Sequence, residues 1–175
     1  MHENSRLVLF YQNQALDDMG RSLEEIWLWD DDRLELVHDF IQWLFPLRER
    51  SEANPSAPVL SSEDIEIFRS DPVIQRNLNT SLERLLLFYG LDAHASDHKK
   101  DLVNSKIFLS KSRNWITPAN HNYLRLTRIL LCLNIVGLRD RAQHLSNMLS
   151  TIYPTYKHEI GERTFSFWSH AVRQS

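Results

Sequence analysis

The chain contains little cysteine, little glycine and no long apolar run. Its 175 residues include one cysteine, Cys132, and four glycines. A single cysteine excludes an internal disulfide and a cysteine-built zinc site, and so few glycines provide no glycine-rich phosphate loop. The longest apolar tract, residues 129–138, is interrupted by Asn134 and Gly137 and reaches only half of the ~20 residues that cross a bilayer. We therefore expect a soluble protein without a transmembrane segment, in a reducing compartment, the cytoplasm.

The chain also lacks an excess of charge of one sign. Twenty lysines and arginines stand against 23 aspartates and glutamates, so the formal net charge is -3. No overall positive field is available to attract nucleic acid or anionic lipid. The apolar run at residues 7–11 is too short for the core of a signal peptide, and the G-x-S-x-G, H-E-x-x-H and Walker patterns do not occur. We expect no nucleic-acid partner, no export and no cofactor.

Helical periodicity is what the sequence does have. Apolar residues recur every three or four positions in most segments, and no segment shows the alternation of a β-strand. With 42% hydrophobic residues, the chain is long enough to bury one sizeable core and short for two. The sequence predicts an all-α fold, a compact multi-helix bundle in which residues 1–175 form a single domain.

Capping residues and apolar spacing indicate where the helices lie. The expected helices are at about residues 7–11, 22–29, 33–45, 61–68, 72–89, 101–112, 118–136, 142–152 and 164–172. Residues 47–60, with two prolines among small polar residues, are expected to form a surface loop. The helices at 33–45 and 118–136 have apolar residues on more than one side and must be buried on more than one side. We expect these two central helices to pack together.

Both central helices also carry polar side chains at the spacing i, i+4, i+7. These residues are Glu35, Asp39 and Gln42 on the first helix, and His121, Arg125 and Arg128 on the second. Because buried charges need partners, the favoured interpretation is an ion-pair lattice between the two helices. The alternative is a site for a small anion or carboxylate, which guanidinium groups bind through paired donors. The candidate binding cluster comprises His38, Asp39, Gln42, Trp43, His121, Asn122, Arg125 and Arg128.

Three further features have a plain structural interpretation beside a functional one. His94 and His98 have the i, i+4 spacing of two metal ligands, but without an assured third ligand a solvated loop is favoured and no metal is predicted. Cys132 lies in an apolar run, where burial raises the pKa of a thiol. An enzyme would depend on His38, Asp39 and His121, yet the same pairing of histidine with acid orients structural histidines in many cores. We therefore predict no catalytic residue.

Aromatic residues offer a further test, because a groove for a peptide exposes them. The candidates are Trp27, Trp29, Trp115 and Trp168. For at least two of them, packing in the core is the favoured interpretation.

Three separated blocks of sequence carry a family resemblance. They read HDFIQWLFPLRE at 38–49, RLLLFYGL at 84–91 and NWITPANHNYLRLTRILLCLNIVGL at 114–138. In this order they resemble the opioid growth factor receptor conserved domain, and the segment from residue 7 resembles the lead-in of its bacterial members. The resemblance covers about residues 7–152 and implies a free-standing bacterial-type domain.

The resemblance also implies a function. Animal members are described as receptors for a short opioid peptide and as associated with nuclear and other membranes, which implies at most peripheral membrane association here. It supplies no catalytic residue. We predict a receptor-like, non-enzymatic binding module for a peptide or protein partner. The alternatives are a small-anion-binding protein or enzyme that uses the buried His/Arg/Asp cluster between the central helices, and a purely structural partner domain.

Overall fold

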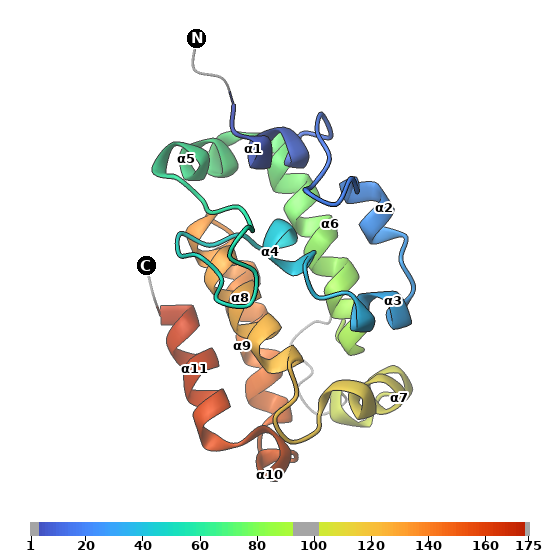
Figure 1. The fold of residues 1–175 in the computed structure, drawn as a ribbon. Helices are drawn as coiled ribbons and strands as arrows, with labels where there is room; N and C mark the ends of the chain where they lie inside the picture. The colour runs from blue at the N-terminus through green and yellow to red at the C-terminus, as the bar shows by residue number, and fades with distance from the viewer. Residues whose placement is uncertain (1–3, 93–101, 174–175) are drawn as a thin grey trace. The chain divides into compact units, whose positions relative to one another are not determined.

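A computed structural model describes residues 4–92 and 102–173 of the chain (Figure 1). Within these residues every element of regular structure is a helix, so the predicted all-α class is confirmed. The chain forms two compact units, unit 1 (Met1–Arg84) and unit 2 (Leu85–Ser175). The boundary falls inside the long helix α6 (Pro72–Tyr89). The expected single domain stays a prediction.

Unit 1 contains short helices, most of which begin at a side-chain cap. They are α1 (Arg6–Tyr11), α2 (Leu23–Trp27), α3 (Asp31–Leu36), α4 (Ile41–Leu44) and α5 (Ser62–Ser70), followed by most of α6. The side chains of Ser22, Asp30 and Ser61 each accept a hydrogen bond from the backbone N–H three residues on, at 3.1, 2.8 and 3.0 Å. Asp71 caps α6 in a similar way, accepting from Val73 N at 2.8 Å. The predicted starts of these four helices are confirmed.

The predicted unbroken helix at 33–45 is wrong. The chain leaves the helical conformation at Val37, whose backbone is extended with φ -88° and ψ 130°, and becomes helical again only at α4. A straight helix would distribute apolar side chains around its whole circumference. The break instead allows Leu34, Phe40 and Phe45 to be fully buried while Leu36 is left 76% exposed. The predicted end before Pro46 is confirmed.

Aromatic side chains from sequence-distant helices form the core of unit 1. The Tyr11 ring meets the Phe68 ring edge to face at 5.1 Å, which joins α1 to α5. The Asn77 side-chain amide of α6 donates to the carbonyl of Tyr11 at 2.7 Å, and the Trp27 indole N–H donates to the Ser81 hydroxyl at 2.9 Å. These contacts hold α1, α2 and α5 to one helix.

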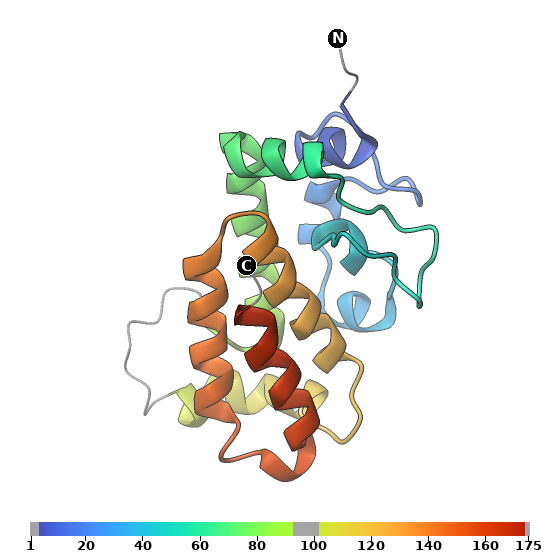
Figure 2. The same ribbon diagram turned by 90° about the vertical axis from the view of Figure 1, so that its left-hand side faces the viewer.

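Unit 2 contains a set of three longer helices and a group of short ones. Its elements after the end of α6 are η1 (Leu102–Asn104), α7 (Lys106–Trp115), α8 (Asn122–Ile135), α9 (Arg139–Ile152), α10 (Lys157–Ile160) and α11 (Glu162–Arg173). Helices α8, α9 and α11 lie side by side in both ribbon views, and α7 and α10 lie at one end of them (Figure 1, Figure 2). The sequence did not predict α10, whose four residues are too few to show a period.

Helix α8 begins four residues later than the sequence predicts. Thr117 and Pro118 carry the start signal in the sequence, but Ala119 has a left-handed backbone with φ 57°, which no helix continues through. The helix begins after His121, and the Asn120 side-chain oxygen accepts from the backbone N–H of its first residue, Asn122, at 2.9 Å. Helix α7 likewise begins at a side-chain cap, Ser105, rather than at residue 101.

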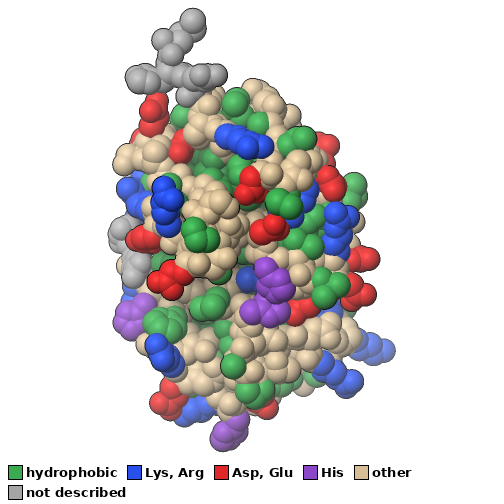
Figure 3. Space-filling view, viewed as in Figure 1, with side chains coloured by type: hydrophobic (Ala, Val, Ile, Leu, Met, Phe, Trp, Pro, Cys, Tyr) green, Lys and Arg blue, Asp and Glu red, His purple; other side chains and the backbone are tan. Residues whose placement is uncertain are grey.

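The surface of the protein carries both signs of charge. Figure 3 shows acidic and basic side chains interspersed over one face, in keeping with the net charge of -3. The absence of a nucleic-acid partner stays a prediction. In the part of the chain that the structure describes, no helix is long and apolar enough to cross a membrane.

Candidate functional site

Four residues of the predicted cluster lie in unit 1, namely His38, Asp39, Gln42 and Trp43. Asp39 lies beside Arg21, which sequence spacing did not indicate. Asp39 accepts a hydrogen bond from the Arg21 guanidinium at 2.8 Å, and the same guanidinium donates to Asp17 at 2.6 Å. Asp17 is fully buried, and its other oxygen accepts from the backbone N–H of Met19 and of Arg21. Burial lowers the pKa of Arg21, but its hydrogen bonds to Asp39 and Asp17 raise it on balance. This ion triad stabilises the loop before α2.

The other three predicted cluster residues of unit 1 lie in different environments. Gln42 is buried, and its amide nitrogen lies 3.4 Å from the Ser51 hydroxyl of the long loop. Trp43 is buried, and its indole N–H donates to Asp18 at 2.9 Å. His38 is exposed. Trp43 thus packs in the core, and His38 does not lie in a buried cluster.

Unit 2 places Asn122 and Arg125 in one buried hydrogen-bond network. The Asn122 side-chain oxygen accepts from the Tyr89 hydroxyl at 3.3 Å and from the Arg125 guanidinium at 3.2 Å. The Trp115 indole N–H donates to the carbonyl of Tyr89 at 3.0 Å. This network connects α8 to the end of α6 and to α7, and both predicted residues are buried in it.

His121 and Arg128 are half-buried, and Arg125 is 4% exposed. The predicted pairing of Arg125 and Arg128 with Glu35 and Asp39 would join the two units and stays a prediction, as does the cluster as a binding site. Cys132 is fully buried as expected, and burial raises the pKa of its thiol although the Arg128 charge acts against it. His94 and His98 lie outside the described residues.

The tryptophans do not line an exposed groove. Trp29, Trp115 and Trp168 are at most 5% exposed. Trp27 is half-buried, and its indole N–H donates a hydrogen bond to the Ser81 hydroxyl within unit 1. Core packing, the favoured interpretation for at least two of the four, is confirmed for Trp29, Trp115 and Trp168.

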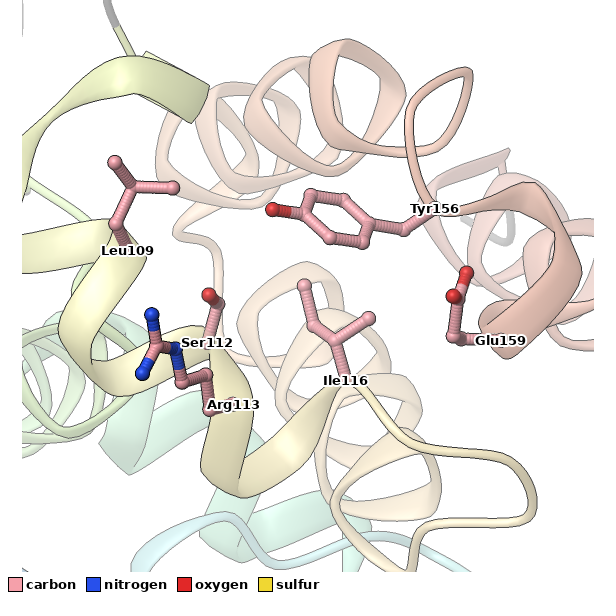
Figure 4. A pocket seen from close by; sticks show the side chains of 6 residues that line it. All are labelled: Leu109, Ser112, Arg113, Ile116, Tyr156 and Glu159. Carbon is pink, nitrogen blue, oxygen red and sulfur yellow. The ribbon is translucent and has the colours of Figure 1, made fainter.

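A pocket that the sequence did not indicate lies within unit 2. It has a volume of about 300 Å³ and is lined by Leu109, Ser112, Arg113, Ile116, Tyr156 and Glu159. The first three residues belong to α7, Ile116 comes directly after it, and the last two lie at the start of α10 and inside it (Figure 4). The volume is at the lower limit of small-ligand sites.

Close backbone packing positions the α7 wall of this pocket. Gly90, at φ +74°, approaches α7 so closely that a Cβ atom there would lie 3.0 Å from the Ile107 carbonyl oxygen and 3.0 Å from Phe108 Cα. The Lys111 ammonium donates to the carbonyl of Leu87 at 2.8 Å. Helix α7 is therefore held against the end of α6.

Aromatic contacts connect the two walls. The buried Phe108 ring meets the Tyr156 ring at 6.0 Å and the Trp115 ring at 6.5 Å. Because Trp115 is bonded to Tyr89, and Tyr89 to Asn122, the pocket is supported by the same buried network that contains two of the predicted site residues.

The charged residues of the pocket stand apart from each other. Figure 4 shows Arg113 and Glu159 at opposite ends of it, with Ile116 and Tyr156 between them. Neither Arg113 nor Glu159 has a hydrogen-bond or ion-pair partner among residues 4–92 and 102–173. Arg113 is exposed and Glu159 is half-buried. The pocket thus offers one cation, one anion and apolar surface to a ligand.

The Glu159 carboxylate acts on a buried tyrosine. The hydroxyl of Tyr123, a residue 5% exposed, has its pKa raised to about 12, chiefly by burial and then by the negative charge of Glu159. The Tyr123 ring packs against Trp168 of α11 at 5.7 Å. The charge of Glu159 therefore acts on the pKa of a group in the core of unit 2.

No sequence signal identifies this pocket. Arg113 and Glu159 are 46 positions apart, neither belongs to a motif, and the short helix that carries Glu159 shows no period. Helix α9 ends at Ile152, as the sequence predicts, but the end of one helix does not indicate which structure the next residues adopt.

Comparison with known proteins identifies the family. The sequence model of the opioid growth factor receptor (OGFr) conserved region matches residues 2–175. The chain is 36% identical over 134 residues to the opioid growth factor receptor of Rattus norvegicus. This match covers 74% of the chain and 22% of that protein. It is 36% identical over 133 residues to that of Homo sapiens, covering 74% of the chain and 19% of that protein.

A relative of a second kind is opioid growth factor receptor-like protein 1 of Xenopus tropicalis, 33% identical over 135 residues, which is 75% of the chain and 26% of that protein. The chain thus matches only about a quarter or less of the length of these relatives. No solved structure is matched. Because the conserved-region model matches nearly the whole chain, the chain belongs to the opioid growth factor receptor conserved region family.

Proposed function

We propose that this chain is a non-enzymatic binding module for a peptide or protein partner and that it acts in the cytoplasm. The pocket between α7 and α10 is the observation that carries the proposal. It combines apolar side chains, Leu109 and Ile116, with one cation and one anion that have no partner among the residues that the structure describes. Peptides present the same three kinds of group close together. Ligand sites generally combine an apolar lining with a few polar groups that fix orientation.

The names of the relatives support the same proposal. Those from Rattus norvegicus and Homo sapiens are named receptors of opioid growth factor. The region that these receptors share with this chain covers 74% of the chain, and we assign ligand binding to it. The proposal extends ligand binding to this chain and leaves the ligand itself open.

A peptide display experiment tests the proposal. We would select peptides from a random library on the full chain and measure their affinities for a double variant, Arg113→Gln with Glu159→Gln. The control is Arg139→Gln with Glu49→Gln, two exposed positions outside the pocket with the same change of charge. We expect selected peptides to bind the pocket variant at least about tenfold more weakly and the control as well as the native chain.

The outcome separates the function from its site. If no peptide is enriched, the proposed binding of peptides is wrong. If enriched peptides bind the pocket variant as tightly as the native chain, the pocket is not the site. Because neither pocket residue has a partner in the described part of the chain, melting temperatures of all variants should agree, which checks that the fold is intact.

A further inference from the structure

We infer that the pocket of unit 2 binds a very short peptide with both ends free, its carboxylate at Arg113 and its ammonium group at Glu159. This inference rests on the proposed function and names the class of ligand. It starts from the two charges, which lie at opposite ends of the pocket and are not paired with each other (Figure 4). Opposite charges in one pocket usually pair with each other. Kept apart, they are complementary to a ligand that carries both signs.

The size of the pocket limits the ligand. About 300 Å³ is at the lower end of the range for small-molecule sites, so the pocket encloses one or two residues of a peptide at a time. A chain rises about 3.3–3.6 Å per residue, so the two charged ends of a dipeptide are on the order of 7 Å apart. A longer peptide would carry its second free end outside the pocket.

The remaining lining residues fit the middle of such a ligand. Ile116 and the Tyr156 ring lie between the charges and offer apolar surface to a side chain (Figure 4). The Tyr156 hydroxyl points toward α7, where the Ser112 hydroxyl also lines the pocket. These hydroxyls can donate to or accept from the peptide group. Arg113 can give a carboxylate two parallel donors, which an ammonium group cannot use.

Four forms of one probe test the inference. The probe is the dipeptide of leucine and phenylalanine, used with free ends, with an acetylated amino end, with an amidated carboxyl end and with both ends blocked. Binding to the full chain is measured at pH 7 by calorimetry, where both free ends are largely charged. We expect the free form to bind most tightly, each single block to weaken binding about tenfold, and the double block to weaken it further.

Two single variants then establish the orientation. With Arg113→Gln the amidated form should bind as well as the free form, while acetylation still weakens binding. With Glu159→Gln the acetylated form should bind as well as the free form, while amidation still weakens binding. Arg139→Gln and Glu49→Gln should each behave as the native chain. A crossed pattern, in which Arg113→Gln removes the effect of acetylation, would overturn the orientation and with it the inference.

Failure here is distinguishable from failure of the proposed function. If the four forms bind equally, or if none binds while library peptides do, the inference of a ligand with two free ends is wrong and the binding module remains. If neither dipeptides nor library peptides bind, the proposed function is also wrong.

Discussion

At the scale of the residue, the buried hydroxyl of Tyr123 links stability to alkaline pH. Burial and then the Glu159 charge raise the pKa of this hydroxyl to about 12, above its ordinary value of 10.0. The folded state therefore holds the proton more tightly than the unfolded state. The resulting stabilisation is fully present below pH 10 and is lost as pH rises toward 12. We expect the free energy of unfolding to fall in this window by up to roughly 1.4 kcal/mol per pH unit from this group.

Urea unfolding at a series of pH values measures this effect. Tyr123→Phe removes the titrating group, so its stability should fall less steeply above about pH 10 than that of the native chain. Glu159→Gln removes only the smaller cause and should reduce the slope partly. Equal slopes for the native chain and Tyr123→Phe would show that the hydroxyl is not held as described.

The thiol of Cys132 gives a second prediction at this scale. The residue is fully buried and burial raises the pKa of its thiol, so little thiolate is present or accessible at neutral pH. We expect an aromatic disulfide reagent to react with the native chain only at the rate of unfolding. Modification should become fast in denaturant. Rapid reaction of the folded chain would contradict the placement of this residue in the core.

At the scale of the element, Asp71 connects the start of α6 to α1. Its carboxylate accepts from the backbone N–H of Val73 and of Ile74, and from the Gln12 side chain at 2.8 Å. These bonds, led by that from Gln12, lower the pKa of Asp71. A lowered pKa means that the stabilisation is present above the unfolded pKa and is lost as pH falls through the folded one.

We therefore expect Asp71→Ala to cost about 1 kcal/mol of unfolding free energy at pH 7. Asp71→Asn keeps one oxygen that can accept the cap hydrogen bonds and should cost less. Because asparagine does not titrate, the unfolding free energy of this variant should fall less than that of the native chain as the pH is lowered. Unfolding in urea at pH 7 and near pH 3 distinguishes the two variants. An alanine variant as stable as the native chain at pH 7 would contradict the cap.

The close contact between the end of α6 and α7 depends on Gly90. Alanine there must adopt a left-handed backbone and also displace the backbone of Ile107 and Phe108. Gly20 is a matched control, since it has φ +77° and a Cβ atom there would have no other atom within 4 Å. We expect Gly20→Ala to cost about 1–2 kcal/mol and Gly90→Ala at least about 1 kcal/mol more. Equal costs in thermal or urea unfolding would show that α7 does not press on Gly90.

Four helix starts in unit 1 were predictable from sequence because a side chain makes the cap, although the cap of α7 at Ser105 was missed. Ser22, Asp30, Ser61 and Asp71 each satisfy a backbone N–H within three residues, so the signal and the structure are both local. The extended backbone at Val37 and the left-handed backbone at Ala119 carry no such signal. No capping or turn motif marks either position, so tertiary packing must select these conformations.

At the scale of the whole molecule, the sequence predicted the class and the family better than the site. The all-α class follows from periodicity summed over many segments, and the family from three blocks that span both units. The candidate pocket depends instead on side chains 46 positions apart, Arg113 and Glu159, which only the folding of unit 2 brings to one place. Regular spacing along one helix cannot reveal such a pair.

The most direct test of peptide binding in unit 2 is a nuclear magnetic resonance titration of the ¹⁵N-labelled full chain with a peptide selected from the library. We expect amide signals of α7 and of residues 156–160 to shift, together with the indole N–H signal of Trp115, which is bonded to Tyr89 behind the pocket. The signals of α1 and α5 in unit 1 should stay unchanged. Shifts confined to unit 1, or no shifts at saturating peptide, would contradict the assignment of binding to this pocket.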